Sequence, residues 1–302
     1  MYEADDPRSA MSANASGKSA DTSASAAFGR STYARFYDEP PQEADAQANT
    51  WYARGANFVV CYSQAKDGAT FERRGQIDEY VLLLHDGALS ATVSANGETQ
   101  EIAGYSITMI PPGHSTITIH GSGEVVRLIS TDNEDVVAKV SNPEKYVGAH
   151  PHVPQFAPWP KPADGFRIRS YSLDVPEEPG RFGKIFRCTT FMVNVFPAQG
   201  PRDPTKLSPH HHDDFEQCSL ALKGWYMHHL RWPWTANLHD WQDDEHEKCL
   251  APSVCVIPPR VIHTSAPSDP GDNVLVDVFA PPREDFSDQP GWVLNAADYP
   301  RK

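Results

Sequence analysis

Three histidines and two neighbouring oxygen donors have the residue types and spacing of a metal site. His210 and His212 are one residue apart in the run PHHHDDFEQCSLALKG, which also contains Glu216 and Gln217. If this run begins a β-strand, the side-chain period of two places both imidazoles on one face. His263 follows in IPPRVIHT, just past a proline-marked turn. Neutral imidazoles with one oxygen donor suit a divalent transition metal and leave positions for water or substrate.

This spacing resembles the two motifs of the cupins, His-x-His-(x3–4)-Glu/Gln-(x6)-Gly and Pro-x-Gly-(x2)-His. The residues that match the first motif are His210, His212, Gln217 and Gly224. Those that match the second are Pro258, Arg260 and His263, with arginine where the family usually has glycine. The resemblance implies metal ligation by His210, His212, His263 and one oxygen donor. Counting from His212 permits Glu216 or Gln217, whereas counting back from Gly224 favours Gln217.

An internal repeat indicates that this unit occurs twice, as in a bicupin. SITMIPPGHST (106–116) aligns with SVCVIPPRVIH (253–263), and IDEYVLLLHDG (77–87) aligns with DFEQCSLALKG (214–224), which places Glu79 opposite Glu216. In the first copy the three histidines are replaced by Arg73, Gly75 and Thr116. Arginine stays protonated and glycine has no side-chain donor. The N-terminal unit is therefore expected to hold no metal and to supply packing surface and an oligomer interface.

The predicted fold class is all-β, with two double-stranded β-helix (jelly-roll) domains in one chain. Short β-branched runs punctuated by Gly, Asn-Gly and Pro-Pro-Gly support this class. Residues 1–48 are expected to be a disordered N-terminal segment, because their first part is rich in Ser, Ala and Asp. The first domain is placed at 49–141, a proline-rich linker at 142–165, and the metal-binding domain at 166–302.

The second unit contains an aromatic insertion between Gly224 and Ser253 that the first unit lacks. It holds most of the chain's tryptophans, including Trp225 and Trp232. Two interpretations are open. The insertion could be a packed flap that seals a core or a dimer interface, since tryptophan buries a large area. Alternatively it is a lid over the barrel mouth, where Trp225 and Trp232 would contact a sugar or aromatic substrate.

The C-terminal run DVFAPPREDF resembles the ending of small cupins that linearise unsaturated uronates in pectin and alginate breakdown. Those proteins use a glutamine as fourth metal ligand, which favours Gln217. The resemblance implies that Asp277 is the acid/base, Phe279 a pocket wall, and Arg283 a clamp for a substrate carboxylate. A guanidinium fork suits a carboxylate through two hydrogen bonds. In the alternative interpretation Arg283 pairs with Asp285 and only completes the barrel.

The metal cage supports several functions. The first hypothesis is a metal-dependent isomerase or lyase for a small carboxylated or sugar-derived substrate, with one divalent ion per chain (Fe, Mn, Ni or Zn). The second is a non-haem Fe(II) dioxygenase acting on an enol or aromatic compound. The third is a non-catalytic, metal-dependent binding protein for a small molecule. A homodimer is the assembly considered for each of them.

Composition excludes several classes of partner. The net charge of −14 disfavours nucleic acid and anionic membranes. No run approaches the ~18 apolar residues of a membrane span, and the N-terminus lacks the pattern of a secretory signal. The five scattered cysteines indicate reduced thiols, and hence a cytoplasmic location.

Overall fold

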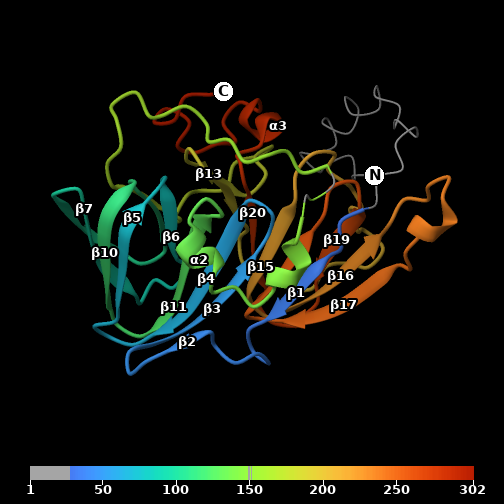
Figure 1. Ribbon diagram of the computed structural model, residues 1–302, viewed down its shortest axis with the longest axis horizontal. Coiled ribbons are helices and arrows are strands. Elements are labelled where there is room, and N and C mark those ends of the chain that lie inside the picture. Colours follow the sequence, from blue (N-terminus) through green and yellow to red (C-terminus); the bar gives the residue numbers. More distant parts are fainter. Residues whose placement is uncertain (1–27, 149, 151) are drawn as a thin grey trace.

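The computed structural model describes residues 28–148, 150 and 152–302, and these form two β-barrel units side by side (Figure 1). Each unit consists of a large and a small antiparallel sheet. The expected all-β architecture of two jelly rolls is therefore confirmed. The helices are short: α2 (Glu134–Val137), α3 (Glu284–Ser287) and the 3-10 turns η1 (Pro143–Tyr146) and η2 (Leu238–Asp240). Within the described residues, no helix is long and apolar enough to cross a membrane.

The N-terminal unit pairs a seven-stranded sheet with a four-stranded sheet. The large sheet has the order β12 (Arg169–Ser172), β9 (Ser106–Ile110), β6 (Tyr80–Leu84), β11 (Gly123–Ser130), β4 (Phe58–Ala65), β3 (Ala48–Arg54) and β2 (Glu43–Ala44). The small sheet has the order β5 (Thr70–Gln76), β10 (Gly113–His120), β7 (Ser90–Ala95) and β8 (Glu98–Ile102). Leucine, isoleucine and valine side chains fill the space between the two sheets.

The C-terminal unit repeats this arrangement with fewer strands. Its large sheet has the order β1 (Thr32–Arg35), β18 (Ser253–Ile257), β15 (Gln217–Lys223), β20 (Val274–Phe279), β14 (Met192–Val195) and β13 (Lys184–Arg187). Its small sheet has the order β17 (Glu245–Leu250), β16 (Trp225–Arg231) and β19 (Ile262–Pro267). The segment that links β16 to β17 projects at the edge of the molecule (Figure 1).

Each unit borrows a strand from the other half of the chain, which corrects the expected domain boundaries. Strand β1 lies within the segment expected to be disordered, yet it pairs with β18 of the C-terminal unit. Strand β12 lies within the expected C-terminal domain, yet it pairs with β9 of the N-terminal unit. The exchange covers open sheet edges, because β18 and β9 each gain a hydrogen-bonded neighbour. Residues 1–27 of the segment expected to be disordered lie outside the described residues.

The two large sheets pack against one another and share the main hydrophobic core. This core joins Val126 and Leu128 of β11 to Cys218 and Leu220 of β15 and to other residues of both units. Since side chains alternate along a strand, the remaining residues of β15 face the interior of the C-terminal barrel. All five cysteines are free and buried.

Candidate metal centre

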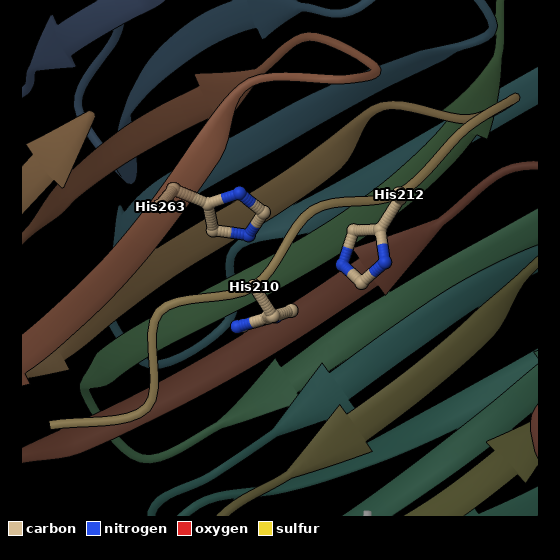
Figure 2. A group of neighbouring side chains, drawn as sticks. All are labelled: His210, His212 and His263. Atoms are coloured by element: carbon tan, nitrogen blue, oxygen red, sulfur yellow. The ribbon is translucent and has the colours of Figure 1, made fainter. Parts of the chain in front are cut away.

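The three histidines predicted to bind a metal converge on one point, as Figure 2 shows. One nitrogen from each of His210, His212 and His263 lies within 4.8 Å of the others. His263 lies on β19. The sequence suggested that His210 and His212 begin a strand. They lie instead on the loop before β15. The loop is fixed by two backbone hydrogen bonds between His210 and His263, with N–O distances of 3.0 and 2.8 Å.

Two of the imidazoles are oriented by backbone carbonyls. The Nδ1 atom of His210 lies 2.9 Å from the carbonyl oxygen of Ser208, and Nδ1 of His263 lies 2.9 Å from that of Val261. A carbonyl oxygen only accepts hydrogen bonds, so each Nδ1 carries the hydrogen and each Nε2 keeps its lone pair. Hydrogen bonding of the distal ring nitrogen is how proteins orient metal-binding histidines.

Burial also favours the neutral form of His212. Its side chain is 9% exposed, and loss of solvation holds its pKa well below the usual value. The nearby charge of Arg283 and the two neighbouring histidines act in the same direction. A neutral imidazole is the form that ligates a metal ion.

Gln217 joins the histidines, whereas Glu216 points away from them. The amide oxygen Oε1 of Gln217 lies 2.9 Å from Nε2 of His212 and 3.4 Å from Nε2 of His263. Glu216 is the neighbouring residue, so its side chain leaves β15 on the opposite face, towards the N-terminal unit. There its carboxylate accepts a 2.6 Å hydrogen bond from the backbone of Ala56. The geometry favours Gln217 over Glu216 as the oxygen donor.

Glu79 of the first copy makes the reciprocal contact. Its carboxylate is buried and accepts hydrogen bonds from the backbone and hydroxyl of Thr189, at 3.1 and 3.0 Å. Thr189 lies between β13 and β14, as Ala56 lies between β3 and β4. Each unit therefore inserts one glutamate into a hairpin turn of the other. Burial raises the pKa of Glu216 to about 7, although the hydrogen bond from Ala56 opposes this.

Arg260 adopts the backbone conformation for which the cupin motif usually has glycine. Its φ is 67°, in the left-handed region. Its backbone N–H donates to the carbonyl oxygen of His212 at 2.5 Å. The turn thus connects the two halves of the histidine cluster, and the arginine retains the geometry of the glycine at a steric cost.

Asp277 faces the barrel interior and contacts the oxygen donor of the cluster. Its carboxylate accepts a 2.9 Å hydrogen bond from the Ser219 hydroxyl and a 3.3 Å hydrogen bond from the Gln217 amide. The amide is thereby oriented with Oε1 towards the histidines. Ser219 was missed in the sequence, although it lies two residues after Gln217 on the same strand face.

Arg283 pairs with Asp285, as in the alternative interpretation of the sequence, and its guanidinium is not an open fork in this structure. Its Nε and Nη2 bind Asp285 at 2.9 and 2.5 Å. The guanidinium also lies 3.6 Å from the ring centroid of Phe286 and 4.8 Å from that of Phe279. Arginine stacks well on aromatic rings, so the ion pair with Asp285 and the stacking on the two phenylalanines together fix this side chain. Phe279 is buried, with its ring 6.2 Å from that of His212.

The two tryptophans expected to contact substrate lie elsewhere. Trp225 begins β16, whereas His263 pairs with Leu230 about 17 Å further along that strand. Trp232 is buried in a small core with Leu230 and is 2% exposed, so that part of the insertion is packed and does not cover a substrate. The exposed tryptophans of the insertion are Trp234 and Trp241, which stack on one another at 4.6 Å.

Comparison with known proteins places this geometry in a known fold. No family model and no curated protein matches the chain, but solved structures do. Oxalate decarboxylase from Lactobacillus farciminis, in complex with formate, aligns with a TM-score of 0.54 and 15% identity over 83% of this chain and 86% of that chain. The chain has the bicupin fold. A Bacillus subtilis oxalate decarboxylase studied for its Mn(II) centres aligns with a TM-score of 0.54, at 13% identity over 87% and 80% of the two chains.

AerE from Microcystis aeruginosa aligns equally well, with a TM-score of 0.54 and 9% identity over 80% of this chain and 96% of that chain.

The two units of this chain differ in the side chains at the positions of the metal-ligating histidines. Arg73, which takes the place of His210, binds Asp135 and Gln76 in the N-terminal unit. No cluster of three metal-ligating side chains occurs in the described part of that unit.

Proposed function

We propose that the C-terminal barrel is a metal-dependent active site with isomerase- or lyase-type chemistry on a small carboxylated or sugar-derived molecule. The observation that carries this proposal is the convergence of His210, His212 and His263 around the amide oxygen of Gln217. Two ligand atoms that share an ion at ~2.1 Å, at a right angle, lie about 3 Å apart. The 2.9 Å between Nε2 of His212 and Oε1 of Gln217 fits that requirement.

This ligand set suits Fe, Mn, Ni or Zn in the divalent state, and all of its donors are uncharged. When bound, such an ion supplies Lewis-acid polarisation of a carbonyl or hydroxyl oxygen. His210 is only partly buried, so it marks the side from which a small molecule would reach the cluster. Phe279 and Phe215 would form an apolar wall on the His212 side.

Asp277 is our candidate for proton transfer. It lies on the interior face of β20, 7% exposed, beside Ser219 and Gln217. A buried carboxylate that accepts two hydrogen bonds is held in one orientation, as a general base requires. The oxalate decarboxylases that share this fold support lyase chemistry on a carboxylate, since their names state that activity.

The proposal is tested by turnover of the metal-loaded chain. Protein loaded with Mn(II) or Fe(II) would be incubated with small carboxylates, including oxalate and uronic acids, under nitrogen and in air. NMR would detect the products. We expect oxygen-independent conversion that EDTA abolishes. Asp277→Asn should retain the metal and lose at least ~100-fold in kcat, because the amide cannot accept the proton. Conversion by Asp277→Asn at the wild-type rate would remove Asp277 from the mechanism.

A dioxygenase is the second candidate, and one observation favours it. The ring of Phe215 stacks on that of His212 with centroids 4.5 Å apart, so the cluster has an aromatic neighbour suited to an enol or aromatic substrate. Turnover that requires oxygen would select this function. A metal-loaded chain that binds such molecules and converts none of them would instead be a binding protein.

A further inference from the structure

The N-terminal unit has a cavity of its own, of about 570 Å³. It lies between β5 and the β2–β3 hairpin, where the two sheets of this barrel end in edge strands. Arg127 and Ile129 of β11 contribute to its lining from the large sheet, and Lys139 from the segment after α2. Its volume falls in the range of pockets that hold small organic molecules.

Arg127 is a buried cation that has no directly bound carboxylate in this cavity. It is 5% exposed, and its guanidinium lies 4.2 Å from the ring centroid of Phe71. Within the described part of the chain it makes no hydrogen bond or ion pair, and its Nε atom is buried without a partner. A buried charge normally requires both pairing and hydrogen bonds. The guanidinium can therefore still donate hydrogen bonds to a ligand that enters the cavity.

The other cations of the cavity already have partners. Arg73 forms a two-point ion pair with Asp135, and Lys139 binds Glu43 at 2.8 Å. These partners satisfy the two cations, so Arg127 is the cation in the cavity that is left without an acceptor.

The acids that line the cavity are also occupied. Glu43 additionally accepts a hydrogen bond from Tyr52, Glu72 binds Arg74 at 2.9 Å, and Asp45 caps the backbone of its own loop. No carboxylate of the described chain forms an ion pair with Arg127, although the charge of Glu43 acts on it at longer range.

The position of Arg127 is the counterpart of Asp277. Arg127 pairs with Leu82 on β6, and Asp277 pairs with Ser219 on β15. Leu82 follows Glu79 at the same interval at which Ser219 follows Glu216, the glutamate that aligns with Glu79. The two barrels therefore place opposite charges at one interior position: an anion beside the metal site and a cation in the barrel without metal ligands.

We propose that the N-terminal barrel is a second ligand site, which binds a small organic carboxylate through Arg127. The planar guanidinium and a carboxylate form two parallel hydrogen bonds, and the buried surroundings strengthen them. Phe71 holds the guanidinium by stacking. This site is separate from the proposed metal centre and requires no metal.

The test is calorimetric titration of the full chain carrying His212→Ala, which disables the metal site so that only the N-terminal cavity is measured. Succinate and inorganic phosphate are titrated separately at low salt. We expect one succinate per chain with micromolar to millimolar affinity. Arg127→Leu should weaken succinate binding at least tenfold, and Arg127→Lys should weaken it less, because a point charge replaces the fork.

Two controls make the result decisive. Arg231→Leu removes an exposed arginine of the C-terminal unit, outside the cavity, and should leave succinate affinity unchanged. Thermal unfolding without anion shows whether each variant is folded, and Arg127→Lys carries the test if Arg127→Leu is not. Absence of succinate binding, binding of phosphate alone, or equal affinities in wild type and the Arg127 variants would each overturn the proposal.

Discussion

Adjacent residues at the start of β15 serve different parts of the molecule. Gln217 faces the barrel interior and the histidines, whereas Glu216 faces the N-terminal unit and binds the backbone of Ala56. Strand alternation separates the two roles, since neighbouring side chains leave a strand on opposite faces. The choice between a charged and a neutral oxygen donor is thus made by the strand geometry, not by the relative strength of the two donors.

Substitution at these two positions should separate metal binding from packing. Gln217→Ala removes the amide oxygen beside His212, and we expect metal affinity to fall about 10–100-fold, as for a lost ligand or orienting partner. Glu216→Gln should leave metal affinity within twofold of wild type, because that carboxylate lies outside the cluster. Competition with a chelator of known affinity measures both variants. A larger loss in Glu216→Gln than in Gln217→Ala would reverse the assignment.

The sequence contains part of the evidence for this distinction. The first copy has lost all three histidines but keeps Glu79 at the position of Glu216, which points to a role unrelated to metal. The sequence left two roles open for Arg283, a clamp for a substrate carboxylate and a partner of Asp285. Its pairing with Asp285 and its stacking on Phe286 depend on how the chain turns after β20, and no local pattern specifies that turn.

At the scale of elements, the turn before β19 determines how the halves of the metal centre meet. Arg260 has a φ of 67°, and its N–H binds the carbonyl oxygen of His212. The position tolerates arginine at a cost of about 1 kcal/mol in backbone conformation. A β-branched residue would be much less compatible with a positive φ.

Arg260→Val should lower the free energy of unfolding by about 1–2 kcal/mol and also weaken metal binding, because the turn that holds His212 is strained further. Arg260→Gly should remain within about 1 kcal/mol of wild type, since relief of strain and the entropy of glycine offset one another. Urea denaturation of the metal-free chains checks this. Equal stabilities for the valine and glycine variants would contradict the account.

The strands of each barrel were largely predictable, but their exchange between the units was not. Alternating and β-branched runs identify β4, β6 and β9 from local sequence. The pairing of β1 with β18 joins residues 32–35 to 253–256, a contact that local periodicity does not encode. The choice between a packed flap and a lid at Trp232 could not be made for the same reason, because its burial depends on a core assembled from distant segments.

At the scale of the whole molecule, two buried glutamates link the units. Burial raises the pKa of Glu79, although hydrogen bonds from Thr189 and Tyr299 oppose the shift. When the pH is below 4.5, the ordinary pKa of a glutamate side chain, the carboxyl is protonated in both the folded and the unfolded chain. As the pH rises above that value the unfolded chain ionises first, so the folded state loses stability through this group until its own pKa is passed.

Glu79→Gln should remove this pH dependence. The variant is expected to gain stability relative to wild type as the pH rises from 4.5 to 8, because the amide never ionises. Urea unfolding across this range measures the difference, with Glu177→Gln as the exposed control. A constant difference between wild type and Glu79→Gln at every pH would show that the native carboxyl ionises as easily as the unfolded one.

The claim that most depends on the whole architecture is that one barrel binds metal and the other does not. Elemental analysis of the purified full chain, reconstituted with Mn(II), Fe(II) or Zn(II) and dialysed, tests it directly. We predict one divalent ion per chain, nearly none in His212→Ala, and a full complement in His239→Ala, which changes an exposed histidine outside the cluster. Two ions per chain, or metal retained by His212→Ala, would contradict the account.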